Sequence, residues 1–117
     1  MEEDCVFCKI AKGEVKDRKI KEDENFFVVD DIKPITRGHK LIISKKHYKT
    51  ILDIPSLLGS ELLAIEKETA LKLMKDDKTI EGFNVINNNF SAAGQVVHHV
   101  HVHLIPRRKD DGLKIFN

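Results

Sequence analysis

The chain has 117 residues, of which 41% are hydrophobic and 33% are charged, so we expect an ordinary globular protein with a single domain over 1–117. Its 20 Lys and Arg nearly balance its 19 Asp and Glu, and the net charge of +1 argues against a protein that binds nucleic acid or a membrane surface by bulk charge. No apolar run is near the roughly 18 residues that a membrane-spanning helix requires. The acidic start, Met1 to Asp4, has no apolar signal segment, so we expect a cytoplasmic protein.

The N-terminal half of the chain predicts a short helix followed by three strands. Residues 5–12 form a helical segment that Gly13 ends, because glycine tolerates the backbone conformation that follows a helix. Apolar and β-branched runs bounded by turn residues predict strands at 19–22, 26–30 and 39–44. Together these three strands suggest an antiparallel meander.

A long helix is predicted next. It opens at Pro55, is capped by Ser56 or restarts at Ser60, and ends at 76–78. Its leucines recur at helical spacing on one face, and its charged residues take the other face. We therefore expect this helix to cover one side of the core.

Two further strands complete the predicted elements. They span 83–87 and 96–105, with a polar loop at 88–94 between them, and Pro106 ends the second strand. Five strands and one long helix predict an α+β domain. The pattern does not define the order of the strands.

Cys5 and Cys8 form a C-x-x-C pair, which is a weak signal by itself. A thioredoxin-like redox pair would need a preceding strand, and none precedes Cys5. Half of a zinc site is a second interpretation, which requires two more nitrogen or sulfur ligands that the histidines could supply. The third interpretation is that both cysteines are small buried core residues.

The most informative segment is a row of histidines on the last predicted strand. Because successive strand side chains point to opposite faces, His99, His101 and His103 share one face, while the valines and leucine between them face the core. Three imidazoles in a row are poorly suited to a hydrophobic core, and lysine or threonine would suit a solvent-exposed face better. They predict either a metal site or a nucleophile with neighbours that move protons and hold the correct tautomer.

The residues that flank this row favour the second interpretation. The preceding loop, 87–95, consists of amides and small residues whose backbone N–H groups could cradle an anion. Arg107 and Arg108 follow Pro106 and add positive charge nearby. A metal-dependent hydrolase would want a carboxylate base beside the histidines, and this segment has none.

These residues resemble the histidine triad (HIT) superfamily, and the branch they resemble most is that of the small prokaryotic histidine triad nucleotide-binding proteins. The resemblance covers essentially the whole chain. It implies a HIT fold, with a five-stranded antiparallel sheet, one long helix and a short N-terminal helix, and a homodimer in which two sheets join. The motifs that carry it are His99-x-His101-x-His103 after Ala93-Gly94-Gln95, Cys5-Val6-Phe7-Cys8-Lys9-Ile10, Val29-Asp30-Asp31-Ile32, Gly38-His39 and Lys45-Lys46-His47.

The resemblance implies a hydrolase that cleaves the α-phosphorus bond of nucleoside 5′-phosphoramidates or related mononucleotide esters and anhydrides. His101 matches the nucleophile that becomes a nucleotidyl-histidine, and His103 matches a phosphate contact. His99 matches the first triad member, which orients the row, and His39 matches its supporting histidine. The alternatives are a catalytically weak nucleotide-binding regulatory module and a dinucleoside polyphosphate hydrolase.

The resemblance also implies a purine mononucleotide partner, such as an AMP derivative, and a structural zinc ion that the catalysis does not require. Asp31 matches the acidic residue that holds the ribose hydroxyls. The positions that match the rest of the nucleotide site are Val6, Phe7, Ile10, Val29, Ile32, Asn88, Gly94, Gln95 and Val96. The positions that match the zinc ligands are Cys5, Cys8, His47 and His99.

Two positions depart from the pattern of this family. Val96 stands where many relatives have Ser, Thr or Glu, and valine cannot contact the phosphate or help the leaving group. Phe90 replaces the usual loop glycine and is expected to reshape the phosphate loop or narrow the pocket. Neither change touches His101, so we predict a working but slow hydrolase.

Overall fold

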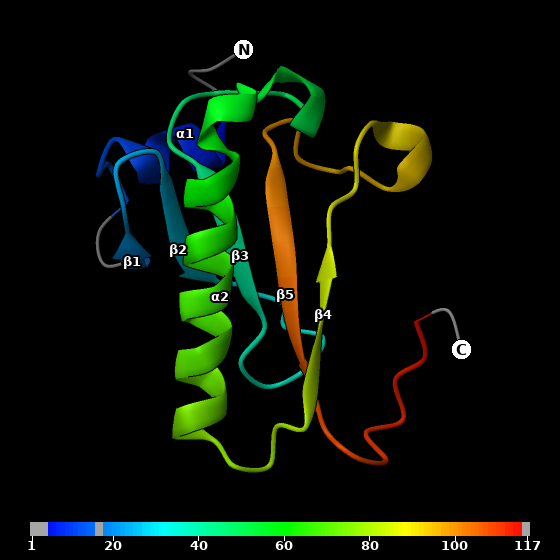
Figure 1. Cartoon of the computed structure of the whole chain (residues 1–117). Coiled ribbons are helices and arrows are strands. Elements are labelled where there is room, and N and C mark those ends of the chain that lie inside the picture. The colour runs from blue at the N-terminus through cyan, green and yellow to red at the C-terminus, as the bar shows by residue number, and fades with distance from the viewer. Residues whose placement is uncertain (1–4, 16–17, 116–117) are drawn as a thin grey trace.

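The computed structural model describes residues 5–15 and 18–115. Its centre is an antiparallel sheet of five strands in the order β1-β2-β3-β5-β4 (Figure 1). The strands are β1 (Lys19–Glu22), β2 (Phe26–Asp30), β3 (Lys40–Ser44), β4 (Gly82–Ile86) and β5 (His101–Arg107). The helices are α1 (Val6–Ala11) and α2 (Gly59–Asp76), with short 3-10 turns at η2 (Ile51–Asp53), η3 (Ser56–Leu58) and η4 (Ser91–Ala93). The five-stranded α+β fold with one long and one short helix is therefore confirmed.

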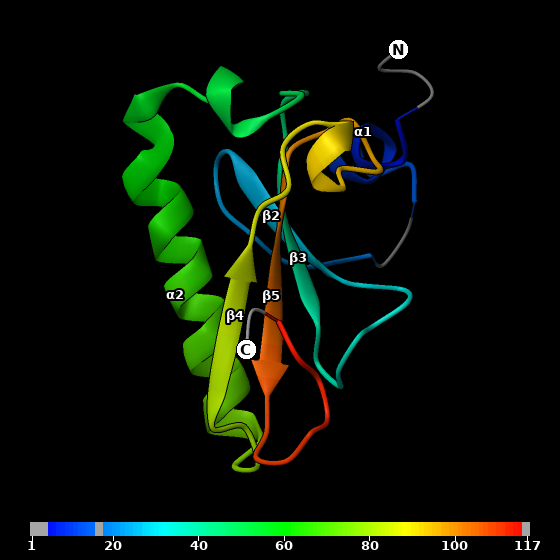
Figure 2. The ribbon, with the colours of Figure 1, turned by 90° about the vertical axis from the view of Figure 1, so that its right-hand side faces the viewer.

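The two helices lie on opposite faces of the sheet, as Figure 2 shows. Strand β2 contributes side chains to the packing of both helices. Phe26 and Val28 belong to the core cluster beneath α2, while Phe27 and Val29 belong to the cluster beneath α1. All four are at most 1% exposed. A strand covered on both faces is apolar throughout rather than alternating, which accounts for the unbroken run of Phe and Val.

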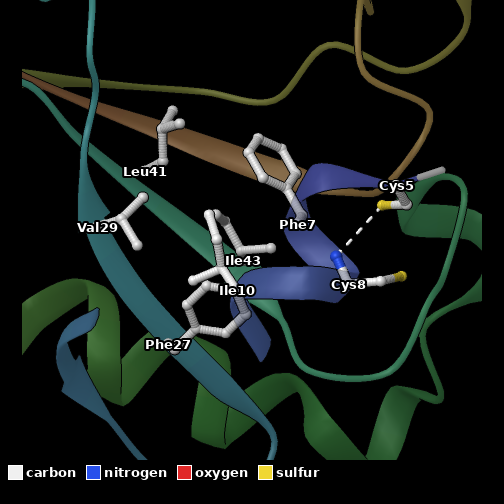
Figure 3. Close-up of a cluster of buried hydrophobic side chains, with 8 residues drawn as sticks. All are labelled: Cys5, Phe7, Cys8, Ile10, Phe27, Val29, Leu41 and Ile43. Carbon is white, nitrogen blue, oxygen red and sulfur yellow. Dashed lines mark hydrogen bonds between the residues drawn. The ribbon is translucent and has the colours of Figure 1, made fainter. Parts of the chain in front are cut away.

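The N-terminal helix lies where the sequence predicts it. Cys5 is its N-cap, and its sulfur accepts a hydrogen bond of 3.3 Å from the Cys8 N–H (Figure 3). Gly13 follows the last turn with φ of +80°, a conformation that favours glycine. The cap therefore brings both cysteines to the same end of α1, while Phe7 and Ile10 point into the core beneath it.

The start of α2 corrects one prediction. Neither Ser56 nor Ser60 caps the helix with its side chain; the N-cap is Leu58, with no side-chain hydrogen bond. The 3-10 turn η3 runs directly into the helix instead, and its Ser56 carbonyl takes up the Gly59 N–H. A backbone carbonyl therefore satisfies an N–H group at the start of the helix, where a serine side chain was expected to do so. The helix ends at Asp76, as predicted.

The last strand is also shifted from its predicted bounds of 96–105. Strand β5 begins at His101 and continues through Pro106 to Arg107. The Arg107 carbonyl accepts from the N–H of Glu81, which directly precedes β4, so the nitrogen of Pro106 faces the β3 side. Strand β3 begins with Lys40 opposite Leu104 and therefore does not extend alongside Pro106. No ladder donor is needed at that point, and proline fits. The other strands are confirmed, with the start of β3 and both ends of β4 displaced by one residue.

No helix in the described part of the chain is long and apolar enough to cross a membrane. The acidic residues Met1 to Asp4, from which the cytoplasmic location was predicted, lie outside the described residues.

Candidate functional site

A cavity of about 580 Å³ opens on the α1 side of the sheet, between α1, the segment before β3, the start of β5 and the loop before it. It gathers most of the predicted site residues: Val6, Phe7, Ile10, Asp31, Ile32, His39, Asn88, Gly94, Val96, His101 and His103. One wall is apolar, and another carries three imidazoles and a carboxylate. An apolar cleft with a few convergent polar groups is typical of a small-molecule site.

Three of the residues predicted for catalysis or nucleotide binding do not line this cavity. Val29 is fully buried in the core beneath α1. Gln95, 3% exposed, braces the loop before β5: its amide donates to the Lys49 carbonyl at 2.6 Å and accepts from the Phe90 N–H at 2.7 Å. His99 is fully buried, and its ring faces the two cysteines.

His39 and His103 form a hydrogen-bonded pair whose direction is fixed by the backbone. The Ile35 N–H donates to His39 Nδ1 at 3.1 Å, so a neutral His39 carries its proton on Nε2. His39 Nε2 then donates to His103 Nδ1 at 2.9 Å, which leaves the His103 proton on Nε2. Asp31 stands beside the pair, with Oδ2 3.5 Å from His39 Nε2 and 4.0 Å from His103 Nδ1.

The ring of His101 has the opposite tautomer. Its Nδ1 lies 2.8 Å from the His99 carbonyl oxygen, which can only accept, so Nδ1 carries the proton and Nε2 carries the electron pair. The Phe7 ring packs edge-on against His101, with ring centres 5.1 Å apart. An imidazole held in this state is a nucleophile rather than a proton donor.

The site keeps its histidines neutral near pH 7. Burial lowers the pKa of His101, and burial lowers the pKa of His39 although Asp31 opposes the change. For His103, burial first and then the charges of His101 and His39 lower the pKa to about 4. The hydrogen-bond pattern described above is therefore the one that holds at neutral pH.

Asp31, His39 and His103 place donor atoms within 4.8 Å of one another, as a metal site would. A metal on His39 Nε2 would move the proton of that ring to Nδ1, where it would oppose the Ile35 N–H. The cluster therefore fits a hydrogen-bond relay better than a metal. The three triad rings also do not converge, since His99 faces away from the cavity.

Cys5, Cys8, His47 and His99 form a second cluster, with ligand atoms within 4.8 Å of one another. His99 Nδ1 lies 3.2 Å from Cys5 Sγ and 3.4 Å from Cys8 Sγ, and His47 Nδ1 lies 3.0 Å from Cys8 Sγ. His99 Nε2 donates to the Ser44 carbonyl at 2.7 Å, which turns Nδ1 toward the sulfurs. Two sulfurs and two imidazole nitrogens match a closed tetrahedral zinc site.

The loop before β5 corrects the predicted anion cradle. The N–H groups of Ala93 and Gln95 donate to the Phe90 carbonyl, and that of Gly94 donates to Ser91, so these three are engaged within the loop. Phe90 lies outside the cavity lining and is 49% exposed, so it does not narrow the pocket. Its φ of +72° and ψ of 156° are a conformation that glycine adopts more easily.

Arg107 and Arg108 do not add charge to the cavity. Arg107 pairs with Asp111, and Arg108 pairs with Asp77 at 2.7 Å. The positive charge comes instead from Arg18 and Lys33, which line the cavity and which the sequence did not single out. The apolar lining residues Leu41 and Ile86 were also missed; both pair with His103 across the sheet, and the strand order that would have located them is not readable from the sequence.

Comparisons with known proteins agree on one family. The HIT domain model matches residues 12–110. An uncharacterized HIT-like protein of Methanocaldococcus jannaschii is 40% identical over 108 residues, which cover 92% of this chain and 82% of that protein. The adenosine 5′-monophosphoramidase HNT1 of Candida albicans is 40% identical over 109 residues, covering 91% and 72%. The adenylylsulfatase HINT3 of Arabidopsis thaliana is 37% identical and matches 97% of this chain, which spans only 57% of that longer protein.

A solved structure extends the similarity to the fold. The crystal structure of a zinc-bound histidine triad family protein from Mycobacterium smegmatis superposes with a TM-score of 0.89 at 36% identity, covering 98% of this chain and 83% of that one. The motif, the fold and the paired arrangement of His39 and His103 beside His101 therefore have one common explanation: the chain belongs to the HIT domain family.

Proposed function

We propose that the protein is a nucleotide-binding hydrolase that cleaves the α-phosphorus bond of nucleoside 5′-phosphoramidates or related mononucleotide esters and anhydrides. The observation that carries the proposal is the 2.8 Å contact between His101 Nδ1 and the His99 carbonyl. It keeps the electron pair on Nε2, the atom that attacks phosphorus. The same ring lines a cavity of about 580 Å³, within the range of ligand pockets.

The reaction runs in two displacements at the α-phosphorus. First, His101 Nε2 forms a bond to phosphorus, and the leaving group departs with the electron pair of the broken bond and takes up a proton from solvent. Then water attacks the nucleotidyl-histidine and gives a proton to solvent, the electron pair of the broken P–N bond returns to Nε2, and a nucleoside monophosphate leaves. Because His103 accepts from His39 at Nδ1, its Nε2–H can donate to a phosphoryl oxygen as negative charge develops there.

The lining of the cavity supports a nucleoside monophosphate as the bound group. The apolar lining residues of α1 and Ile32 suit a base, and the Asp31 carboxylate can accept from ribose hydroxyls. Arg18 and Lys33 supply positive charge for an anionic substrate. The relatives named adenosine 5′-monophosphoramidase and adenylylsulfatase make an AMP derivative the first substrate to test. The proposal assigns Asn88 and Gly94, which also line the cavity, to the phosphate.

The kinetic test uses an adenosine 5′-phosphoramidate. His101→Ala should abolish turnover while AMP still binds, because the variant removes the nucleophile and leaves the rest of the cavity. His98→Ala is the matched control, since His98 is exposed and lies outside the cavity lining. Full activity of His101→Ala would contradict the assignment of the nucleophile.

Val96 favours a second candidate, a catalytically weak nucleotide-binding module. Its side chain lines the cavity and is 85% exposed, and it has no proton to give to a leaving group. Tight AMP binding without turnover of a nucleoside phosphoramidate or a dinucleoside polyphosphate would identify this module.

We further propose that Cys5, Cys8, His47 and His99 hold one structural zinc ion. The donor set and the Ser44 contact behind His99 support it, as does the zinc-bound relative. Zinc bound here supplies folding energy and a fixed geometry, because four protein ligands leave no position for a substrate. Metal analysis of the purified protein should give about one zinc per chain; no zinc after purification without chelators would contradict the site.

We also propose a homodimer in which two sheets join along β4. Strand β4 is an edge of the described sheet, and Phe83 and Val85 on it are 44% and 46% exposed. An edge strand with exposed apolar side chains is a template for pairing with a second chain.

A further inference from the structure

His99 connects the Cys5–Cys8–His47–His99 cluster to the predicted nucleophile His101, through different atoms. Its imidazole takes part in the Cys5–Cys8–His47 cluster, with Nδ1 3.2 Å from Cys5 Sγ. Its carbonyl oxygen lies 2.8 Å from His101 Nδ1. A displacement of this one residue therefore changes both the ligand set and the hydrogen bond that selects the nucleophilic tautomer of His101.

We propose that the Cys5–Cys8–His47–His99 cluster controls the rate of the chemical step by positioning the His99 carbonyl, so that loss of its metal slows attack by His101 more than it weakens nucleotide binding. This coupling rests on the proposed hydrolase function and goes beyond the structural role of zinc. His99 is then a positioning residue, which acts on the substrate only through His101.

The backbone around His99 gives the first argument. Strand β5 and its pairing with β3 begin at His101, so the His99 carbonyl is not held by the sheet ladder. Residues 97–99 form a bend. The position of this carbonyl depends instead on the anchors of its own residue and of Val100, the next residue.

Both anchors are connected to the Cys5–Cys8–His47–His99 cluster. The first is the His99 ring itself, held between Cys5 Sγ and the Ser44 carbonyl. The second is the Val100 N–H, which donates to the Tyr48 carbonyl at 2.7 Å, and Tyr48 directly follows the ligand His47. A shift of the ligand segment 47–48 is therefore passed to the backbone on the C-terminal side of His99.

Phe7 provides a third connection. It lies between the two cysteines in the chain, and its ring meets His99 at 5.8 Å and His101 at 5.1 Å between ring centres, both edge-on (Figure 3 shows its place beside Cys5 and Cys8). The helix turn that carries both sulfurs therefore also packs against the nucleophile. Displacing reacting groups by about 1 Å costs on the order of a hundredfold in rate, so small shifts of this assembly are sufficient.

The test separates rate from binding. Wild-type protein is prepared with zinc and after removal of zinc by a chelator, and the rate of nucleotidyl-His101 formation from an adenosine 5′-phosphoramidate is measured by rapid quench. We expect this rate to fall by about 10- to 100-fold on zinc removal, the usual effect of losing a supporting contact, while AMP affinity falls by a smaller factor, because α1 also lines the cavity. ¹⁵N NMR of the His101 ring should show the Nδ1–H tautomer with zinc and a mixture of tautomers without it.

A matched pair of variants at His47 gives an independent measurement. His47 lies outside the cavity lining, so these substitutions alter the cluster without entering the nucleotide site. His47→Gln removes a ligand and should behave like the zinc-free protein, whereas His47→Cys replaces one ligand type with another and should recover the zinc and most of the rate. Circular dichroism establishes that each variant is folded.

Three results are decisive. An unchanged adduct rate and an unchanged His101 tautomer in folded, zinc-free protein would overturn the coupling and leave the hydrolase intact. A loss of AMP affinity equal to the loss of rate would also overturn it, because the cluster would then support the whole pocket. No adduct in zinc-loaded wild type would overturn the proposed hydrolase and, with it, the control of its rate.

Discussion

His101 and His103 have the same side chain, yet their hydrogen bonds give them opposite roles. A carbonyl holds the proton of His101 on Nδ1, while the His39 ring holds the proton of His103 on Nε2. Strand alternation predicted that His101 and His103 share a face, whereas His99 lies before β5 with its ring at the cysteines, and His39 was assigned by the family resemblance. The sequence did not predict the tautomers, since these depend on Ile35 and on the His99 carbonyl, which only the folded backbone brings into place.

Val96 is the residue whose substitution should change the chemistry most specifically. An amine leaving group needs a proton, and valine has none to give or relay. Val96→Ser should raise turnover of an adenosine 5′-phosphoramidate by about tenfold, less than the roughly hundredfold or more that an optimally positioned proton donor contributes. Steady-state kinetics checks this, with Val96→Ala as the control that reduces the side chain without adding a hydroxyl. Equal gains in both variants would mean that pocket volume, not proton supply, limits the rate.

Phe90 has a strained backbone conformation, which lowers the stability of the fold. Its φ of +72° with ψ of 156° lies in a region that is essentially restricted to glycine. Phe90→Gly should therefore raise the free energy of unfolding by about 1 kcal/mol, a net value after the greater entropy of glycine in the unfolded chain. Urea denaturation measures the change. Phe90→Ala removes the ring but keeps the strain, so stabilisation by alanine as large as that by glycine would contradict this explanation.

At the scale of elements, the limits of the sequence are clearest in β5. Alternation from 96 to 105 predicted a longer strand that Pro106 would end, but the residues before His101 are drawn out of the sheet by the cysteine cluster and by Tyr48. Pro106 is tolerated because β3 does not extend alongside it, so no β3 carbonyl lacks a hydrogen bond from the missing N–H. Both outcomes depend on neighbouring elements, whereas β1 and β2, defined by local turns and apolar runs, were predicted with their bounds.

The paired histidines on β5 and before β3 should make the protein sensitive to acid. The pKa of His103 is about 4 in the fold against 6.5 when unperturbed, and the pKa of His39 and His101 is lowered too. The unfolded chain therefore binds protons first as pH falls, so stability present above pH 6.5 is lost toward pH 4. After allowance for solvent screening, His103 should account for about 1–2 kcal/mol of that loss.

Denaturation of metal-free protein at several pH values from 7 to 4 measures this effect without a contribution from zinc release. His103→Asn removes one of the three groups and should flatten the profile by the same 1–2 kcal/mol. A free energy of unfolding that stays constant or rises as the pH falls through this window would be inconsistent with neutral, buried imidazoles.

At the scale of the whole molecule, the motifs that resemble the family come from segments far apart in the chain. Helix α1, the segment before β3 and the start of β5 meet at one cavity only because β3 and β5 are neighbours in the sheet. The resemblance anticipated this meeting, but composition and periodicity did not, because they contain no information on strand order. The cavity cations Arg18 and Lys33 were missed for the same reason.

The proposed homodimer leads to a prediction at this scale. Phe83→Lys places a charge on the exposed edge of the sheet and should convert a dimer into a monomer, since edge charges oppose strand pairing. Light scattering coupled to size-exclusion chromatography reports the mass. Leu57→Lys, on a residue that is 92% exposed outside the sheet, is the control and should remain dimeric. A wild-type protein with the mass of a monomer at micromolar concentration would contradict the dimer.

The central claim is that His101 Nε2 attacks the α-phosphorus. Mass spectrometry of protein quenched during turnover of an adenosine 5′-phosphoramidate tests it most directly, with a His103→Asn variant to slow release of the intermediate. We predict a mass increase of one adenylyl group, mapped by peptide fragmentation to His101 and absent from His101→Ala. An adduct on another residue, or turnover by His101→Ala at the wild-type rate, would contradict the claim.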